Sequence, residues 1–171
     1  MKHQNFESTF FQMLRLHNEI VNSIDLRKKA SPFQITSFGR DCFSQFRKTI
    51  QENYKVWNPH APEPARIENA YSLFWDEHRS DLGHYFRYLY TILKFIKQSE
   101  IEDKKKYSNI IRAQLSDQEL FVIFYNCLYK YGVEKFKPLA EEFALFDNIP
   151  QEFLLNIDHR FMYSHEAFGE G

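Results

Sequence analysis

The feature that most constrains the fold is an apolar and aromatic stretch over residues 82–96. Its apolar residues recur every three or four positions, which places them on one broad face if the stretch is helical. Those residues are Leu82, Tyr85, Phe86, Leu89, Leu93 and Ile96. A helix with so wide an apolar face needs other helices around it. The stretch therefore predicts a helical domain built about it.

Composition supports a folded helical domain and indicates the compartment and the partners to expect for it. The chain of 171 residues is long enough to bury a core, and 43% of its residues are hydrophobic. Five glycines and six prolines are few for a fold with many tight turns. A net charge of -1 provides no basic field that would attract nucleic acid. Cys42 and Cys127 show no pairing pattern, which indicates a reducing compartment, and no apolar run reaches the roughly 18 residues of a membrane-spanning helix.

Helical periodicity predicts an all-α fold, a single compact helical domain of about six helices. Apolar residues recur at helical spacing over residues 6–28, 36–57, 65–97, 107–115, 120–131, 133–146 and 150–157. We expect one domain over residues 1–157, with aromatic-rich helices at 84–97 and 117–131 at its centre. Residues 158–171 are expected to form a loosely ordered tail. Val, Ile and Thr are sparse, and no segment has a convincing strand pattern.

Local signals mark the ends of the second central helix. Ser116 and Glu119 have the spacing of a capping box, in which each side chain bonds the other residue's backbone amide. Gly132 follows the apolar run as a C-terminal stop. Gly83 lies inside the earlier predicted helix, 65–97. Glycine is unfavourable in the interior of a helix, so a kink or a junction of two helices could fall there.

A set of polar residues lies in or beside the apolar stripes of the predicted helices. Burying such groups is costly unless they are hydrogen-bonded, so they either form an internal network or line a pocket. The network is the favoured interpretation, and a ligand site is the alternative. The candidate binding residues are His17, Asn18, Arg112, Gln114, Glu119 and Asn126, and Arg87 has a similar setting.

One catalytic pattern is an arginine followed, after about four to six residues, by a histidine, as in small helical ribonucleases of the HEPN type. Proton transfer needs a histidine of near-neutral pKa, and arginine binds the phosphate. Arg79 with His84 and Arg160 with His165 match, and Arg87 shares a predicted helix face with His84. The pattern is loose, and chance matches are expected among seven histidines. A metal-independent ribonuclease acting on RNA is therefore a second hypothesis.

The sequence contains no recognisable motif for binding a metal ion, a phosphate or a dinucleotide. His60, His78 and His84 do not have the spacing that places two metal ligands on adjacent helical turns. Phosphate-loop and dinucleotide-binding patterns are absent from the sequence. We therefore expect no metal site and no cofactor, and the residues leave open whether the protein is an enzyme.

Five segments of the chain resemble the bacterial phage abortive infection family, the AbiC-like proteins. They are residues 6–21, 39–43, 83–90, 107–120 and 124–128, which occur in the family's order. The second segment, Gly-Arg-Asp-Cys-Phe, and the third, Gly-His-Tyr-Phe-Arg-Tyr-Leu-Tyr, are the most specific of them.

The resemblance implies a role in bacterial defence against phage, by arresting or killing the infected cell. Our first hypothesis is a sensor or effector module that binds a phage component or a host partner protein. A helical scaffold that depends on membrane attachment or on a homo-oligomer is a third hypothesis. Similar proteins often begin with hydrophobic helices anchored in the inner membrane, whereas this chain starts almost directly at the first segment. We therefore expect a cytoplasmic protein, or the cytoplasmic part of an inner-membrane protein.

Overall fold

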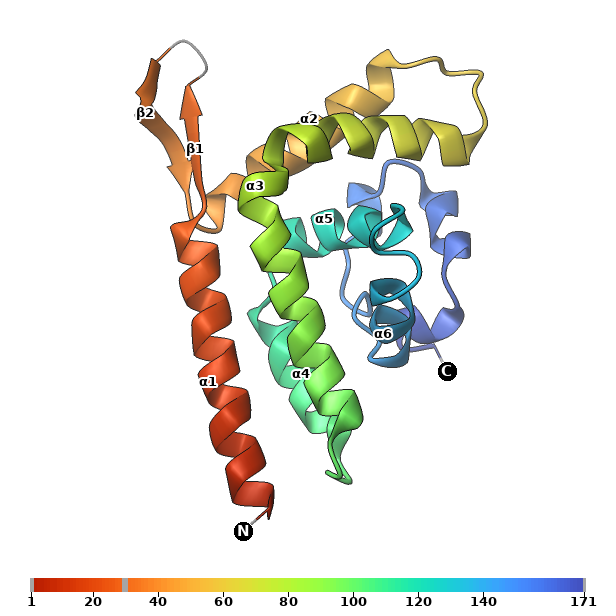
Figure 1. The fold of residues 1–171 in the computed structure, drawn as a ribbon. Helices are drawn as coiled ribbons and strands as arrows, with labels where there is room; N and C mark the ends of the chain where they lie inside the picture. The colour runs from red at the N-terminus through yellow and green to blue at the C-terminus, as the bar shows by residue number, and fades with distance from the viewer. Residues whose placement is uncertain (1, 29–30, 171) are drawn as a thin grey trace. The chain divides into compact units, whose positions relative to one another are not determined.

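The computed structural model describes residues 2–28 and 31–170, and this described part is predominantly helical (Figure 1). Its α-helices are α1 (Lys2–Ser23), α2 (Asp41–Val56), α3 (Glu63–Gln98), α4 (Lys104–Gln114), α5 (Asp117–Leu128) and α6 (Phe136–Glu142). Its strands are β1 (Asp25–Lys28) and β2 (Ser31–Phe38), and its 3-10 helices are η1 (Gln151–Phe153), η2 (Ile157–Met162) and η3 (His165–Phe168). The predicted helical fold class is confirmed.

The chain divides into two compact units, each built from two separate segments. Unit 1 consists of Met1–Cys42 and Ser80–Gln114, and unit 2 of Phe43–Arg79 and Leu115–Gly171. Helix α3 contributes its first part to unit 2 and its second part to unit 1. The helix is unbroken through Gly83, so the junction considered there is not found. Buried neighbours of Gly83, among them Leu82 and Tyr85, hold this turn in the helix despite the glycine.

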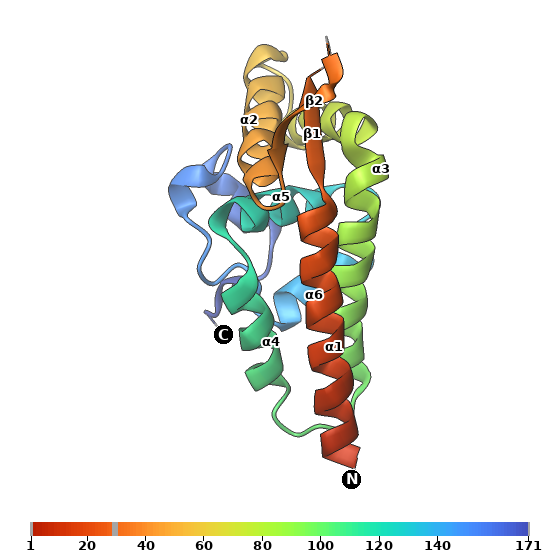
Figure 2. The ribbon, with the colours of Figure 1, turned by 90° about the vertical axis from the view of Figure 1, so that its left-hand side faces the viewer.

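Unit 1 is a bundle in which α1, the second part of α3 and α4 lie side by side (Figure 2). Aromatic rings connect the three helices. Phe6 of α1 stacks on Phe95 of α3, with centroids 4.9 Å apart, and meets the ring of Tyr107 of α4 edge-on at 4.8 Å. Farther along α1, the ring of His17 lies 5.2 Å from that of Tyr85. The apolar face predicted for residues 82–96 is buried as expected.

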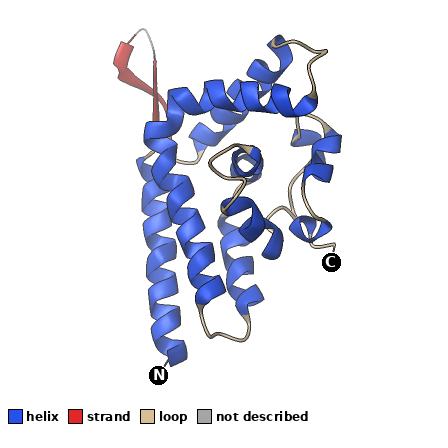
Figure 3. Ribbon diagram, turned by 45° about the vertical axis from the view of Figure 1, so that its right-hand side comes forward, coloured by secondary structure: helices blue, strands red, loops and turns tan. Residues whose placement is uncertain are grey.

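The β1–β2 hairpin corrects two predictions, because helices were expected over 6–28 and 36–57 and no strand was expected (Figure 3). Helix α1 ends at Ser23, and residues 25–28 pair with β2 in antiparallel register, with Asp25 opposite Phe38. β-Branched Ile35 and Thr36 suit an extended backbone, and the Thr36 hydroxyl donates to the Leu26 carbonyl.

Gly39 makes the turn from β2 into α2. Its backbone has a φ of +61°, a conformation that costs about 1–2 kcal/mol for other L-residues. Its N–H donates to the Ile24 carbonyl at 2.7 Å, and α2 then starts at Asp41. This requirement explains the glycine in the Gly-Arg-Asp segment.

The core of unit 2 is built around α5, whose residues 119–127 are all buried. Phe124 contacts the rings of Phe146 and Tyr163, and α6 packs against α5 and η3. The helix ends at Leu128 rather than at residue 131. Gly132 follows in the turn, where a Cβ atom would lie 2.2 Å from the Asn126 carbonyl oxygen. The chain passes so close to the end of α5 that only glycine fits.

The end of the chain, where a loosely ordered tail was expected, contains η2 and η3. It buries His159, Tyr163, Ala167 and Phe168, and the Arg160 guanidinium lies over the Phe168 ring. These residues lack helical spacing, because 3-10 turns and extended links separate them. Gly171 lies outside the described residues, and the predicted single domain with its boundary at 157 stays a prediction.

Candidate functional site

The catalytic candidates lie on the surface of α3. Nη2 of Arg87 lies 3.4 Å from Nδ1 of His84, and both side chains are exposed in unit 1. Arg79 is exposed on the part of α3 that belongs to unit 2. His84, together with Asp81 and the end of α1, lines a small pocket of about 270 Å³. The structure thus places Arg87 with His84, and the catalytic role of both stays a prediction.

Two of the predicted binding residues meet in unit 1. The Asn18 amide donates to Oε1 of Gln114 at 3.3 Å, and the Arg40 guanidinium donates to Oδ1 of Asn18 at 3.2 Å. Asn18 and Gln114 are half-buried, whereas Arg40 is exposed. These residues come from three of the five segments that resemble the abortive infection family. The turn at Gly39 brings Arg40 to this position.

His17 and Arg112 also lie in unit 1 but make other contacts. His17 is buried, with 2% of its surface exposed, and its ring packs at 5.2 Å from Tyr85. Arg112 is half-buried and donates to the side chain of Asn109 one turn earlier in α4, at 3.0 Å. These contacts agree with structural roles.

Glu119 and Asn126 belong to unit 2 and serve the architecture of α5. Ser116 Oγ accepts from the Glu119 amide at 3.2 Å, and Oε2 of Glu119 accepts from the Ser116 amide at 2.8 Å, so the predicted capping box is present. The Asn126 amide donates to the buried hydroxyl of Tyr71 at 2.7 Å. The six predicted binding residues therefore fall into both units, and their role in binding stays a prediction.

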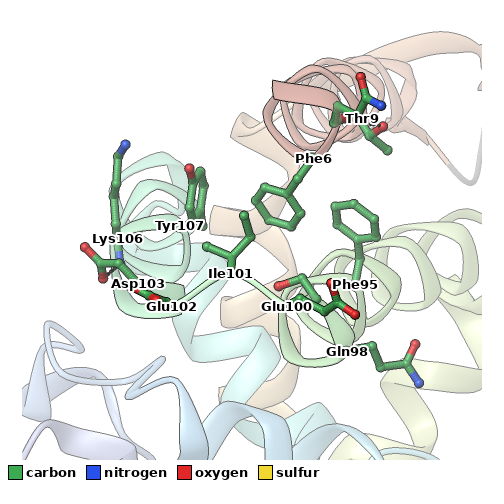
Figure 4. Close-up of a pocket in the computed structure, with 12 residues that line it drawn as sticks. Phe6, Thr9, Phe95, Gln98, Glu100, Ile101, Glu102, Asp103, Lys106 and Tyr107 are labelled. Carbon is green, nitrogen blue, oxygen red and sulfur yellow. Dashed lines mark hydrogen bonds between the residues drawn. The ribbon is translucent and has the colours of Figure 1, made fainter. Parts of the chain in front are cut away.

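A groove in unit 1 forms a further candidate site that the sequence did not suggest (Figure 4). It has a volume of about 770 Å³ and lies among the start of α1, the end of α3, the connection 99–103 and the start of α4. Its wall is apolar and consists of Phe6, Phe95, Ile101 and Tyr107. The remaining lining residues are Asn5, Thr9, Gln98, Ser99, Glu100, Glu102, Asp103 and Lys106.

Backbone-directed hydrogen bonds shape the connection that forms one rim of the groove. Oδ1 of Asp103 accepts from the Lys106 amide at 3.1 Å, which caps the N-terminus of α4. The Lys104 ammonium donates to the Lys97 carbonyl at 2.6 Å, near the end of α3. Residues 99–106 thus form an organised rim whose charged side chains are mostly exposed. Its one signal in the sequence is Ile101, an apolar residue among charges.

Tyr107 is held in the wall by a contact with α1. Its hydroxyl donates to Oε1 of Glu7 at 2.7 Å, and the Lys106 ammonium lies 3.6 Å from the same oxygen. Burial, reinforced by the bond to Glu7, raises the pKa of Tyr107 to about 12. Tyr107 therefore stays neutral, and its ring remains an apolar surface.

A second cluster missed by the sequence lies in unit 2, around Glu63 at the start of α3. Oε2 of Glu63 accepts from the Tyr54 hydroxyl at 2.7 Å and from Nε2 of His159 at 2.8 Å. The Arg66 guanidinium donates to Oε1 of Glu63 at 2.7 Å. One carboxylate thus joins residues of α2, α3 and η2.

Tyr125 extends this cluster and fixes the tautomer of His159. The Tyr125 oxygen accepts from the Leu155 amide at 2.8 Å and lies 2.9 Å from Nδ1 of His159. The hydroxyl proton therefore points to Nδ1, and the imidazole proton sits on Nε2 and points to Glu63. Burial lowers the pKa of His159, although the bond to Glu63 opposes this shift. A neutral imidazole satisfies every partner in the cluster.

The fold and the sites define a helical protein with an aromatic-walled surface groove in one unit and, in the other, a tyrosine–histidine–glutamate cluster whose histidine is buried and whose glutamate is half-buried. None of the helices in the described part is both long and apolar enough to cross a membrane.

Within this class, residues 77–154 match the model of a family described as "Putative phage abortive infection protein". The match includes the segments 83–90, 107–120 and 124–128, so the resemblance to this family is confirmed over that part of the chain. The segments 6–21 and 39–43 lie outside the matched residues. No curated protein and no solved structure matches the chain significantly.

Proposed function

We propose that the protein acts in phage abortive infection as a sensor or effector module that binds a protein partner in the groove of unit 1. The family match supports the role in abortive infection. The observation that carries the binding role is the groove itself, with its volume of about 770 Å³, apolar wall and polar rim. Protein interfaces have this organisation, with an apolar centre surrounded by polar groups.

Partial exposure of the wall supports this proposal. Phe95 and Ile101 are each half-buried, so both retain apolar surface in contact with water. A partner that covers this surface gains free energy from its removal from water. Ile101 is well suited to a test because it lies in the connection between α3 and α4, outside both helices.

The direct test is the plating of phage on bacteria that produce the complete protein or its Ile101→Ser variant. We expect the variant to lose protection while its melting temperature stays close to that of the parent. Ile157→Ser is the matched control, because Ile157 is a 49% exposed isoleucine of unit 2 that does not line the groove. Equal protection by all three proteins would contradict the proposal.

A second candidate function is a metal-independent ribonuclease, which the exposed pair of His84 and Arg87 favours. Cleavage of total bacterial RNA by the purified protein in the presence of a chelator tests it. Cleavage that disappears in His84→Ala would support the ribonuclease. Absence of cleavage by the folded parent protein would remove this candidate.

A further inference from the structure

We propose that the occupant of the groove is a peptide segment that carries a bulky apolar side chain next to lysine or arginine. This inference rests on the function proposed above and specifies the chemistry of the partner. It follows from the wall, the charge of the rim and the openness of the groove.

The wall selects a bulky apolar side chain. The Phe6 and Phe95 rings are nearly parallel, with an interplanar angle of 3°, and Tyr107 meets Phe6 edge-on at 77°. Figure 4 shows these three rings converging with Ile101 around the opening. An aromatic or aliphatic side chain placed here would cover the exposed parts of Phe95 and Ile101, and the ring of Phe6 packs behind that of Phe95.

The rim selects positive charge. Glu100, Glu102 and Asp103 all line the groove, and the first two flank Ile101 in the sequence. Among the described lining residues Lys106 is the one lysine or arginine, and its ammonium lies 3.6 Å from Glu7. Among the described residues that line the groove, carboxylates therefore outnumber cations by three to one. Complementary charge favours a basic partner and discriminates against an acidic one.

The exposure of the lining residues favours a peptide over a small molecule. Small-molecule sites enclose most of their ligand and orient it with a few buried polar groups. Here the buried lining residues are Phe6 and Tyr107, and the Tyr107 hydroxyl already donates to Glu7. The carboxylates of Glu100, Glu102 and Asp103 stand exposed at the edge. This arrangement suits a segment of polypeptide that lies across the opening.

Fluorescence anisotropy with three labelled peptides tests the inference on the complete protein. The first peptide combines Leu and Phe with Lys, the second replaces each Lys by Glu, and the third replaces each Leu and Phe by Ser. We expect the first to bind at least roughly tenfold more tightly than the other two. Ile101→Ser should weaken its binding by a similar factor.

A charge-reversing substitution tests the contribution of the rim to binding separately from that of the wall. Glu102→Lys should reduce the preference for the basic over the acidic peptide, whereas Glu19→Lys, an exposed change on α1 outside the groove, should leave that preference intact. Circular dichroism and thermal melting verify that each variant is folded.

Three results would overturn the inference. Equal binding of the basic and acidic peptides would show that charge plays no part. A concentration-dependent dimer that Ile101→Ser abolishes would make a second copy the occupant. If no peptide binds while Ile101→Ser still removes phage protection, the inference fails and the proposed function stands. Failure of the proposed function itself would give a different result, because Ile101→Ser would then protect against phage as well as the parent protein.

Discussion

Nε2 of His159 lies 2.8 Å from Oε2 of Glu63, although the two residues are 96 positions apart in the chain. His159 is almost completely buried, with 1% of its surface exposed, and its other ring nitrogen faces the Tyr125 hydroxyl. The contact joins the start of α3 to η2 within unit 2. Because a neutral imidazole satisfies both neighbours, the stability of this unit should depend on pH.

We expect the protein to lose stability as the pH falls below the ordinary pKa of histidine. The pKa of His159 is lower in the folded protein than its ordinary value of 6.5, so the unfolded chain binds the proton more readily. The contribution is complete above pH 6.5 and declines as the pH falls below that value. The pKa of Glu63 is also lowered, because bonds from His159, Tyr54 and Arg66 outweigh the opposing effect of burial. Glu63 adds a further loss below its ordinary value of 4.5.

Urea denaturation at several pH values measures this dependence. His159→Gln should reduce the difference in unfolding free energy between about pH 7.5 and about pH 5.5, because the amide does not titrate. His60→Gln is the matched control, since His60 is an exposed histidine of unit 2 outside this cluster. An unaltered pH dependence in His159→Gln would contradict the assignment of a neutral, buried imidazole.

Two glycines of the chain should respond to alanine in opposite directions. Gly132→Ala should destabilise the protein by more than about 1 kcal/mol, because its Cβ would clash with the Asn126 carbonyl oxygen at 2.2 Å. Gly83→Ala should stabilise it by about 0.5–1 kcal/mol, since Gly83 lies within α3 and its Cβ would meet only the Arg87 side chain at 3.7 Å. Chemical denaturation measures both changes. Stabilisation by Gly132→Ala would contradict this account of the turn after α5, and destabilisation by Gly83→Ala would contradict the account of the glycine in α3.

Removal of the cap on α5 should weaken unit 2. Ser116→Ala eliminates the hydroxyl that accepts from the Glu119 amide at 3.2 Å, and we expect a loss of about 1 kcal/mol. Ser116→Asp should retain most of the stability, because aspartate also accepts hydrogen bonds at this position. The unfolding free energies of the two variants provide the comparison, and equal losses would argue against capping as the cause.

His84→Ala should leave the fold intact. His84 is exposed, and its one described hydrogen-bonding contact, with Arg87, is long at 3.4 Å, so the unfolding free energy should change by less than about 0.5 kcal/mol. A loss of phage protection without a loss of stability would then indicate a functional role. A fall in melting temperature together with protection would instead identify His84 as a structural residue.

Much of the fold could be predicted because it depends on local patterns. The apolar spacing of residues 82–96 and the pairing of Ser116 with Glu119 are properties of one helix each. The hairpin was missed because Ile24 extends the apolar stripe of α1 beyond Ser23, so the periodicity suggested continued helix. The structure instead pairs Leu26 with Ser37 of β2. Strand pairing depends on a partner that periodicity does not reveal.

The candidate sites were less accessible to sequence reasoning. The wall of the groove combines Phe6 of α1, Phe95 of α3, Ile101 of the connection and Tyr107 of α4, and helical periodicity assigns the aromatic residues only to core faces. The sequence did indicate that Asn18 and Gln114 are polar residues beside apolar stripes. It could not show that they bond each other or that Arg40 joins them, because such contacts depend on the folded arrangement of distant segments.

The measurement that tests the central claim most directly is the efficiency of phage plating on cells producing the parent protein, Ile101→Val or Ile101→Ser, at equal protein levels and melting temperatures. Valine keeps an apolar side chain in the wall of the groove, whereas serine removes it. The account predicts that Ile101→Val protects like the parent and that Ile101→Ser does not. Full protection by Ile101→Ser would contradict the claim that the groove binds the partner through which the protein acts.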